Sequence, residues 1–390
     1  MLMKAINKNL TPQLRFPEFK NSSEWEEKKL GELTLDINER NNSNLTKVLS
    51  VTNAYGIVEQ EDFFQKIVAS EDLSNYKVIR KGDIAYNPSR INVGSVDILN
   101  KYKLGIMSPM YVIVRCKENI LDNFFLKQWL ISGTFYLLLE KYLQGGVRKS
   151  LPYNLFKNID ILIPSFKEQQ KIAYFLSSVD ELIIEQVKKL EKLKEYKKGL
   201  LQNLFPKENQ KVPDLRFSEF KNSGEWEEKK LDDISYYIAS NYSASSALEQ
   251  GKYCLYDANK IIGFVNAYLC DRDYISIIKD GSGVGRTRFM KAYSNFIGTM
   301  GGIVPNDDIN SYFLYSLVNN INFKQYIKGA TIPHIYYTDY SEHIVYITCT
   351  EEQKKIADFL ASVDELIIEQ IKKIEIMQEY KKGLLQKLFL

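Results

Sequence analysis

At 390 residues the chain exceeds the usual size of one domain, and its 45% hydrophobic content is that of a globular protein that buries its own cores. A net charge of +3 is too small to identify an anionic partner, and two histidines are too few for a histidine-based metal centre. No segment approaches the roughly 18–20 apolar residues of a membrane helix, the first ten residues lack the apolar core of a secretory signal, and the four cysteines form no CxxC pair. The composition therefore predicts a cytoplasmic protein of two or three domains with reduced thiols.

The chain carries two kinds of repeat. PQLRFPEFKNSSEWEEKKL at residues 12–30 returns as PDLRFSEFKNSGEWEEKKL at residues 213–231, with 16 of 19 residues identical at a separation of 201. A longer repeat relates residues 168–205 to residues 352–389, with 29 of 38 residues identical at a separation of 184. The order of short repeat, variable block and long repeat therefore occurs twice, which indicates a duplicated unit.

The first variable block, residues 34–167, has the pattern of a mixed α/β domain. KVLSVTN, YVIVRC and IDILIP predict short strands, because β-branched and aromatic residues dominate them. Residues 123–143, NFFLKQWLISGTFYLLLEKYL, predict one helix.

The second variable block, residues 235–351, shares landmarks with the first. DYISIIK predicts a strand, and SYFLYSLVNNINFKQYI is a counterpart of the helix. Val93-Gly94 recurs as Val284-Gly285, and LGIM recurs as IGTM, at separations of 191 and 193. Landmarks that keep their order predict one fold that has diverged in two copies.

The long repeat predicts a long helix in each copy. Apolar residues recur at alternating steps of three and four, the spacing of one helix face, and each helix would be about 57 Å long. A narrow stripe of this length needs a helical partner, so we expect the two helices to pair with each other. Gln186 and Lys197, repeated as Gln370 and Lys381, would be polar positions that fix the register. The expected pairing residues are Leu176, Val179, Ile183, Leu190, Leu193, Leu200, Leu360, Val363, Ile367, Ile374, Met377 and Leu384.

Motifs for catalysis are missing. DGSGVGR at residues 280–286 is glycine-rich, but it matches neither GxGxxG nor GxxxxGK[ST]. NPSR at residues 87–90 is similar to the Asn-Pro-Pro-aromatic motif of amino-methyltransferases, but it lacks the second proline and the aromatic residue. With no HExxH, GxSxG or Cys/His arrangement, the sequence predicts no catalytic residue and no metal site in this chain.

Loops suited to reading nucleic acid lie at matching places in both blocks. Arginine, asparagine and lysine side chains recognise base edges and phosphates, and glycines allow the backbone to approach phosphates closely. Each loop taken alone is also compatible with an ordinary surface turn. The expected DNA contacts are Asn87, Ser89, Arg90, Asn92, Arg148, Lys149 and Ser150 in the first block, and Lys279, Ser282, Arg286, Thr287, Arg288, Thr331, His334, Tyr336 and Tyr337 in the second.

The paired LRFPEFK…EWEEKKL segments, the paired EQQKIA…DELI helices and the two dissimilar blocks between them resemble the specificity subunit of type I restriction–modification systems. The resemblance spans essentially the whole chain. It implies an α+β fold in which two α/β target recognition domains are joined and spaced by two long helices, paired as an antiparallel coiled coil with pseudo-two-fold symmetry. The implied parts are a conserved segment at 1–33, recognition domain 1 at 34–167, long helix 1 at 168–206, the second conserved segment at 207–234, recognition domain 2 at 235–351 and long helix 2 at 352–390.

The resemblance also implies partners. Each recognition domain would read one half of a split double-stranded DNA target, and the constant segments would dock two methyltransferase subunits and, through the assembly, a nuclease/translocase subunit. The cofactor S-adenosylmethionine is expected in the methyltransferase and none in this chain. Two alternatives stay open from the residues alone: a free-standing repressor of a split operator, and a scaffold whose blocks bind proteins. The missing motifs argue against a self-sufficient methyltransferase.

Overall fold

The computed structural model describes residues 10–52, 55–61, 72–143, 150–329 and 331–390, and these form two compact units. The first unit contains residues 1–187 and 373–390, and the second contains residues 188–372. The division passes through both long helices, so it leaves the predicted domain boundaries untested. Among the described residues we find no helix with the length and apolar character that crossing a membrane requires.

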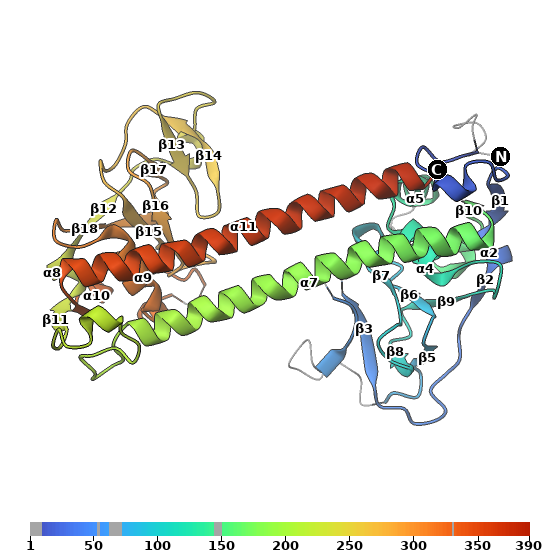
Figure 1. Ribbon diagram of the computed structural model, residues 1–390, viewed down its shortest axis with the longest axis horizontal. Helices are drawn as coiled ribbons and strands as arrows, with labels where there is room; N and C mark the ends of the chain where they lie inside the picture. Colours follow the sequence, from blue (N-terminus) through green and yellow to red (C-terminus); the bar gives the residue numbers. More distant parts are fainter. Residues whose placement is uncertain (1–9, 53–54, 62–71, 144–149, 330) are drawn as a thin grey trace. The chain divides into compact units, whose positions relative to one another are not determined.

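The described strands of the first unit form three small sheets, with strand orders β1-β10, β2-β9-β6-β7 and β4-β3-β8-β5 (Figure 1). Its strands are β1 Glu26–Lys29, β2 Thr34–Asp36, β3 Val48–Thr52, β4 Gly56–Glu59, β5 Lys77–Arg80, β6 Ile84–Tyr86, β7 Val96–Ile98, β8 Leu104–Met107, β9 Val112–Cys116 and β10 Asp160–Ile163. Its helices are η1 Pro17–Phe19, α2 Leu30–Leu33, η2 Ile91–Val93, α4 Asn123–Leu130, α5 Gly133–Leu143, α6 Tyr153–Phe156 and the first part of α7 Phe166–Leu204.

The second unit repeats this plan with the sheets β11-β19, β12-β18-β15-β16 and β14-β13-β17. Its strands are β11 Glu227–Lys230, β12 Ser235–Ala239, β13 Tyr253–Tyr256, β14 Ile261–Val265, β15 Tyr274–Ile278, β16 Thr287–Met290, β17 Asn295–Phe296, β18 Met300–Pro305 and β19 Ile344–Ile347. Its helices are η3 Ser218–Phe220, α8 Leu231–Ile234, η4 Ala244–Ser246, α9 Ser311–Asn320, η5 Phe323–Tyr326, α10 Tyr337–Tyr340 and the first part of α11 Thr350–Leu388.

The two units share most of their topology, as the landmarks predicted, although among the described residues the sheet β14-β13-β17 lacks a counterpart of β5. In each, one strand pair is parallel within an otherwise antiparallel sheet: β3 with β8, and β13 with β17. Gly94 and Gly285, the glycines of the repeated Val-Gly landmark, both adopt a left-handed conformation, with φ of 86° and 83°. Only glycine adopts this conformation without strain, so the landmark marks the same turn in both units.

The predicted strands in KVLSVTN, YVIVRC, IDILIP and DYISIIK are confirmed as β3, β9, β10 and β15. The prediction of one helix over residues 123–143 is wrong, because α4 ends at Leu130 and α5 begins at Gly133. Ser132 causes the break: its hydroxyl donates to the carbonyl of Trp129 and accepts from the amide of Phe135, which ends one helix and caps the next.

The short and long repeats are joined by a buried ion pair in each unit. Arg15 makes two bonds of 2.8 Å to the carboxylate of Glu168, and the two side chains are only 7% and 1% exposed. Arg216 and Glu352 repeat this geometry at 2.7 Å. Glu168 and Glu352 lie near the starts of α7 and α11, so the ion pair joins each short repeat to the long helix beside it.

The residue after each glutamate attaches the variable domain. Gln169 accepts from the amide of Asp122, the N-cap of α4, and Gln353 accepts from the amide of Asn310, the N-cap of α9. The carboxamide nitrogens donate in turn to the carbonyls of Pro164 and Thr348. Two consecutive residues thus connect the constant segments to the first helix of each domain.

The long helices are confirmed, and they run antiparallel. In the first unit Lys381 of α11 lies 2.5 Å from Asp180 of α7, and in the second unit Lys197 of α7 lies 2.7 Å from Asp364 of α11. Burial raises the pKa of Asp180, but the ammonium groups of Lys127 and Lys381 outweigh burial and hold that pKa below its usual value. The two lysines among the predicted polar positions are therefore paired across the helices, and the predicted fold class is confirmed.

The stripe residues lie inward along both helices. Those that are buried are Leu176, Val179, Leu200, Leu360, Val363, Ile367, Ile374 and Leu384, and those that are half-buried are Ile183, Leu190, Leu193 and Met377. In the first unit the start of α7 and the end of α11 share a core with Trp25 and Phe125, and in the second unit Trp226 and Phe313 take these places. Equivalent aromatic residues therefore anchor the helices in both units.

Glu352→Ala is predicted to destabilise the second unit by about 3–5 kcal/mol, because it leaves the guanidinium of Arg216 buried without its carboxylate. Urea unfolding followed by tryptophan fluorescence measures the change. Glu219→Gln is the matched control, since it removes the exposed partner of Lys355 in the same unit and should shift the transition little. A loss no larger than that of the control would contradict the structural role of the ion pair.

Candidate nucleic-acid interface

In the first unit the predicted reading loop is the turn between β6 and β7, which contains η2. The side chains of Ser89, Arg90 and Asn92 are exposed there. The carbonyl of Pro88 accepts from the amide of Leu151 at 2.9 Å, so this turn lies beside the segment that precedes α6. Ser150, half-buried, therefore lies close to the turn, whereas Arg148 and Lys149 lie outside the described residues.

Asn87 differs from the other residues of this loop. It is 9% exposed, and its side-chain oxygen accepts from the amide of Ser89 at 3.0 Å. Its own amide donates to the carbonyl of Ser95. Asn87 therefore shapes the turn by an Asx bond, and its acceptor atom is already in use within the loop.

In the second unit the two predicted loops lie side by side. The amide of Gly281 donates to the carbonyl of Pro333, and the amide of Ile335 donates to the carbonyl of Lys279, both at 2.9 Å. The second bond is the counterpart of the bond from Leu151 to Pro88 in the first unit. Each variable domain thus presents two hydrogen-bonded segments at the same place in its fold.

The predicted contacts in these two loops of the second unit differ in exposure and in chemical type. Ser282 and Thr331 are exposed, and Lys279 is half-buried. The exposed ring of Tyr336 packs against His334 at 4.9 Å between ring centroids. Tyr337 is half-buried and stacks on Tyr237 at 4.9 Å, so it supports the cluster from within.

Arg286, which directly precedes β16, and Arg288 on β16 are positioned by a turn that the sequence did not indicate. Arg286 donates to the carbonyl of Ala258 and to the side chain of Asn259, both at 2.7 Å. Arg288 donates to the carbonyl of Asn259 at 2.6 Å. Thr287, between them on the strand, donates to Asn319. The contacts span 27–32 residues of sequence, so no local pattern could have revealed Ala258 and Asn259 as part of this site.

Both clusters offer hydrogen-bond donors on the domain surface, and the second adds aromatic rings and glycine-rich backbone, which is the chemistry of nucleic-acid recognition. Within the described residues we find no group of three or more His, Cys, Asp or Glu side chains that could hold a metal ion.

Comparison with known proteins gives one consistent result. The family model for the type I restriction modification DNA specificity domain matches residues 22–195 and 223–378. The chain belongs to this DNA specificity family.

Two specificity subunits from Methanocaldococcus jannaschii are similar in sequence. One, of the type I restriction enzyme MjaVIII, is 25% identical over 79% of this chain and 78% of its own length. The other, of the putative type I restriction enzyme MjaX, is 25% identical over 82% and 80%. The type I restriction–modification S subunit from M. genitalium shares the fold, with a TM-score of 0.61 and 18% identity over 97% of this chain and 99% of that one.

Membership makes DNA specificity the role of this chain within a restriction–modification complex that includes other subunits. Family members supply specificity and not catalysis. The predicted identity, the non-catalytic role and the fold are therefore confirmed.

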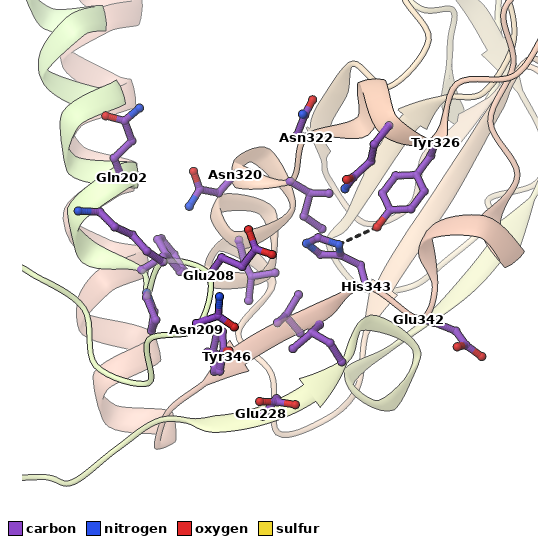
Figure 2. Close-up of a pocket in the computed structure, with 18 of the residues that line it drawn as sticks. Gln202, Glu208, Asn209, Glu228, Asn320, Asn322, Tyr326, Glu342, His343 and Tyr346 are labelled. Carbon is purple, nitrogen blue, oxygen red and sulfur yellow. Dashed lines mark hydrogen bonds between the residues drawn. The ribbon is translucent and has the colours of Figure 1, made fainter.

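The second unit of this specificity subunit also contains a pocket of about 1050 Å³ that shares no residue with the predicted DNA contacts. Three parts of the unit line it: the end of α7 and the segment that follows, the residues from the end of α9 into η5, and the residues around β19. Figure 2 shows His343 directed at the hydroxyl of Tyr326, 2.7 Å from Nδ1, and Gln202 and Glu208 on the side of α7. Its polar lining includes the carboxamides of Gln202, Asn203, Asn209, Asn320, Asn322 and Gln325.

Burial lowers the pKa of His343, although the carboxylate of Glu208 acts in the opposite direction. The imidazole of His343 therefore binds a proton less readily in the folded chain than in the unfolded chain. The neutral imidazole of His343 therefore stabilises the fold fully above the pKa of the unfolded chain, about 6.5. This stabilisation is lost as the pH falls from there through the lower pKa of the folded chain. We predict that His343→Gln flattens the fall in melting temperature between pH 7 and pH 5. Parallel curves for the variant and the wild type would contradict the prediction.

Proposed function

We propose that this chain reads a bipartite DNA target, one half with each variable domain, and that its duplicated segments dock two methyltransferase subunits. The support comes from a contrast between two surfaces. The reading clusters differ in nearly every side chain, whereas the surface of the long helices presents the same apolar residues twice.

That repeated surface is the observation on which the proposal rests. Leu182 and Leu366 are 50% and 51% exposed, Ile184 and Ile368 are 51% and 50% exposed, and Tyr196 and Tyr380 are 54% and 61% exposed. Members of each pair are 184 residues apart, so they occupy equivalent positions of the long repeat. Large apolar side chains that gather into one exposed patch are characteristic of surfaces that bind a partner.

The leucine and the tyrosine come together within each unit. Asp180 lies beside Lys381, so Leu182 and Tyr380 are at about the same level of the antiparallel pair. Each directly precedes an inward-facing residue, and such positions lie on the same side of an antiparallel pair. By the same reasoning Tyr196 and Leu366 lie together in the second unit. Each unit therefore offers one copy of the same apolar patch.

Two equal patches suit two copies of one partner. On a duplex with local two-fold symmetry, equivalent docking surfaces would bring one methyltransferase to each half-site in the same pose. The partner would bind S-adenosylmethionine and flip and methylate the target adenine. The long helices would set the spacing between half-sites, a nuclease/translocase subunit would join the full complex, and the assembly would act in the cytoplasm.

A repressor of a split operator is the second candidate. Its two domains would also read unlike half-sites, but it would bind DNA tightly alone and would need no partner on the repeated patches. The half-exposed leucines and tyrosines favour the first proposal, because a free-standing repressor gives no reason to keep them twice.

Genome-wide adenine methylation, measured with the cognate methyltransferase in the presence and absence of this chain, tests the proposal. We expect methylation at one split motif only when the chain is present. Exchange of residues 235–351 for the block of another specificity subunit should change only one half of that motif. No methylation, together with tight DNA binding by the chain alone, would support the repressor instead.

Tyr380→Ala and Tyr196→Ala should each weaken the docking of one methyltransferase by about 2 kcal/mol, roughly 30-fold, because each truncates an aromatic anchor of one patch. Native mass spectrometry at limiting methyltransferase should then show one bound subunit instead of two, and the double variant should bind neither. Tyr174→Ala is the matched control. Tyr174 is 76% exposed on the same helix, but its counterpart is Asp358, so it belongs to no repeated patch. Equal losses in all three variants would contradict the assignment.

A further inference from the structure

A second, smaller pocket in the second unit has features that DNA reading in general does not explain. It has a volume of about 230 Å³ and lies where β15, β16, α9 and the turn at Ala258–Asn259 meet. Its polar lining includes Asn259, Ser276, Arg286 and Arg288. The two arginines were predicted DNA contacts, whereas Ser276 and Asn259 were not.

Ser276 is a buried donor that lacks a partner. It lies within β15, it is 0% exposed, and its hydroxyl has no hydrogen bond within the part of the chain that the structure describes. Buried hydroxyls are nearly always bonded, because an unpaired one loses its bonds to water without replacement. Ser276 is among the residues that line the pocket, which makes its hydroxyl the candidate donor to a group bound there.

Both arginines are fixed at the mouth of this pocket. Each uses one terminal nitrogen to bond the turn at residues 258–259, and Arg288 also lies over the ring of Tyr256 at 5.7 Å. Neither forms an ion pair within the described residues. The carboxylate of Asp257, in the same turn, accepts instead from the amides of Asn259 and Lys260. A guanidinium carries five donors, so donors remain for a ligand without any rearrangement.

In the first unit the equivalent strand positions carry other side chains with other contacts. In the β15–β16 ladder Ser276 lies opposite Arg288, and 191 residues earlier Ala85 of β6 lies opposite Asp97 of β7. Asp97 accepts from the amide of Ile57 on β4 at 3.0 Å, and a side chain on Gly56 would collide with its carboxylate. The first unit thus has the methyl group of Ala85 and the hydrogen-bonded carboxylate of Asp97. At the same positions the second unit has the unpaired hydroxyl of Ser276 and the guanidinium of Arg288, which has donors left over. Within the described residues, these strand positions therefore distinguish the second domain from the first.

We propose that this pocket binds a phosphate group, and that in the DNA complex it holds one backbone phosphate of the half-site read by the second domain. Two guanidinium groups provide donors only, and the hydroxyl of Ser276 has one further O–H to donate, which suits a phosphate. A guanine edge is recognised by one planar arginine at the surface and would leave Ser276 unpaired. The inference rests on the proposed function, and it makes Arg286 and Arg288 positioning contacts instead of base-reading ones.

The test uses the assembled complex and DNA duplexes that contain the split motif at which the complex methylates adenine. Single neutral methylphosphonates are placed along the second half-site, and the affinity of each duplex is compared for the wild-type chain and for Ser276→Ala. Alanine is the residue at the equivalent position of the first unit, so the variant should fold. We expect one methylphosphonate to weaken wild-type binding about tenfold and to have no further effect on Ser276→Ala, which should itself bind unmodified DNA about tenfold more weakly.

Arg288→Gln should remove the same sensitivity and reduce the slope of log affinity against log salt by about one. Arg272→Gln is the control, because Arg272 is exposed in the same domain and pairs with Asp307. It should keep the methylphosphonate sensitivity unchanged.

Inorganic phosphate distinguishes the source of the ligand. If phosphate raises the melting temperature of the wild type but not of Ser276→Ala, while no methylphosphonate is coupled to Ser276, the pocket holds a free phosphate and not DNA. If neither coupling occurs, or if Ser276→Ala changes the preferred base at one position, the phosphate assignment is wrong. Methylation of the split motif reports the proposed function separately, so that function can stand while the pocket assignment fails.

Discussion

The buried bond between an arginine of each short repeat and a glutamate of each long repeat is the constraint on which the rest of the architecture depends. Arg15 and Glu168 are 153 residues apart, yet each satisfies the other in a site from which water is nearly excluded. Loss of either partner would strand a buried charge, so both residues must persist together. The chain between them forms a closed loop that is free to vary. This explains why nearly identical segments flank blocks that have little sequence in common.

The glutamine that follows each of these glutamates attaches the variable domain to the long helix. Gln169 and Gln353 bond only backbone groups, at the N-caps of α4 and α9 and in the turn before each long helix. Backbone groups are present whatever the side chains are, so the attachment places almost no demand on the sequence of the domain. The turns that carry the reading clusters are correspondingly unlike, and the Ala85–Asp97 pair of one unit is replaced by Ser276 and Arg288 in the other.

The sequence predicted well those features that depend on local periodicity or on repetition. The long helices, their inward stripe and the strands β3, β9, β10 and β15 follow directly from residue spacing. The break between α4 and α5 did not, because Ile131 continues the apolar pattern while the hydroxyl of Ser132 competes for the backbone. Contacts between distant residues were beyond reach for a different reason. Nothing in the neighbourhood of Arg286 indicates that its guanidinium is anchored at Ala258, which depends on how two sheets pack.

The polar positions of the long helices show how a fixed pair of helices accepts unlike domains. Lys381–Asp180 and Lys197–Asp364 are equivalent ion pairs, but their third partners differ: Gln128 of α4 donates to Asp180, whereas Tyr312 of α9 donates to Asp364. A carboxylate has several acceptor sites, so an amide or a phenol can complete it equally well. Any domain whose first helix offers one donor at this level therefore supplies a bond to this half-buried carboxylate. The helices therefore require a hydrogen-bond donor at this level and not a particular residue. The recognition domains can diverge in sequence while each keeps its attachment to the long helices.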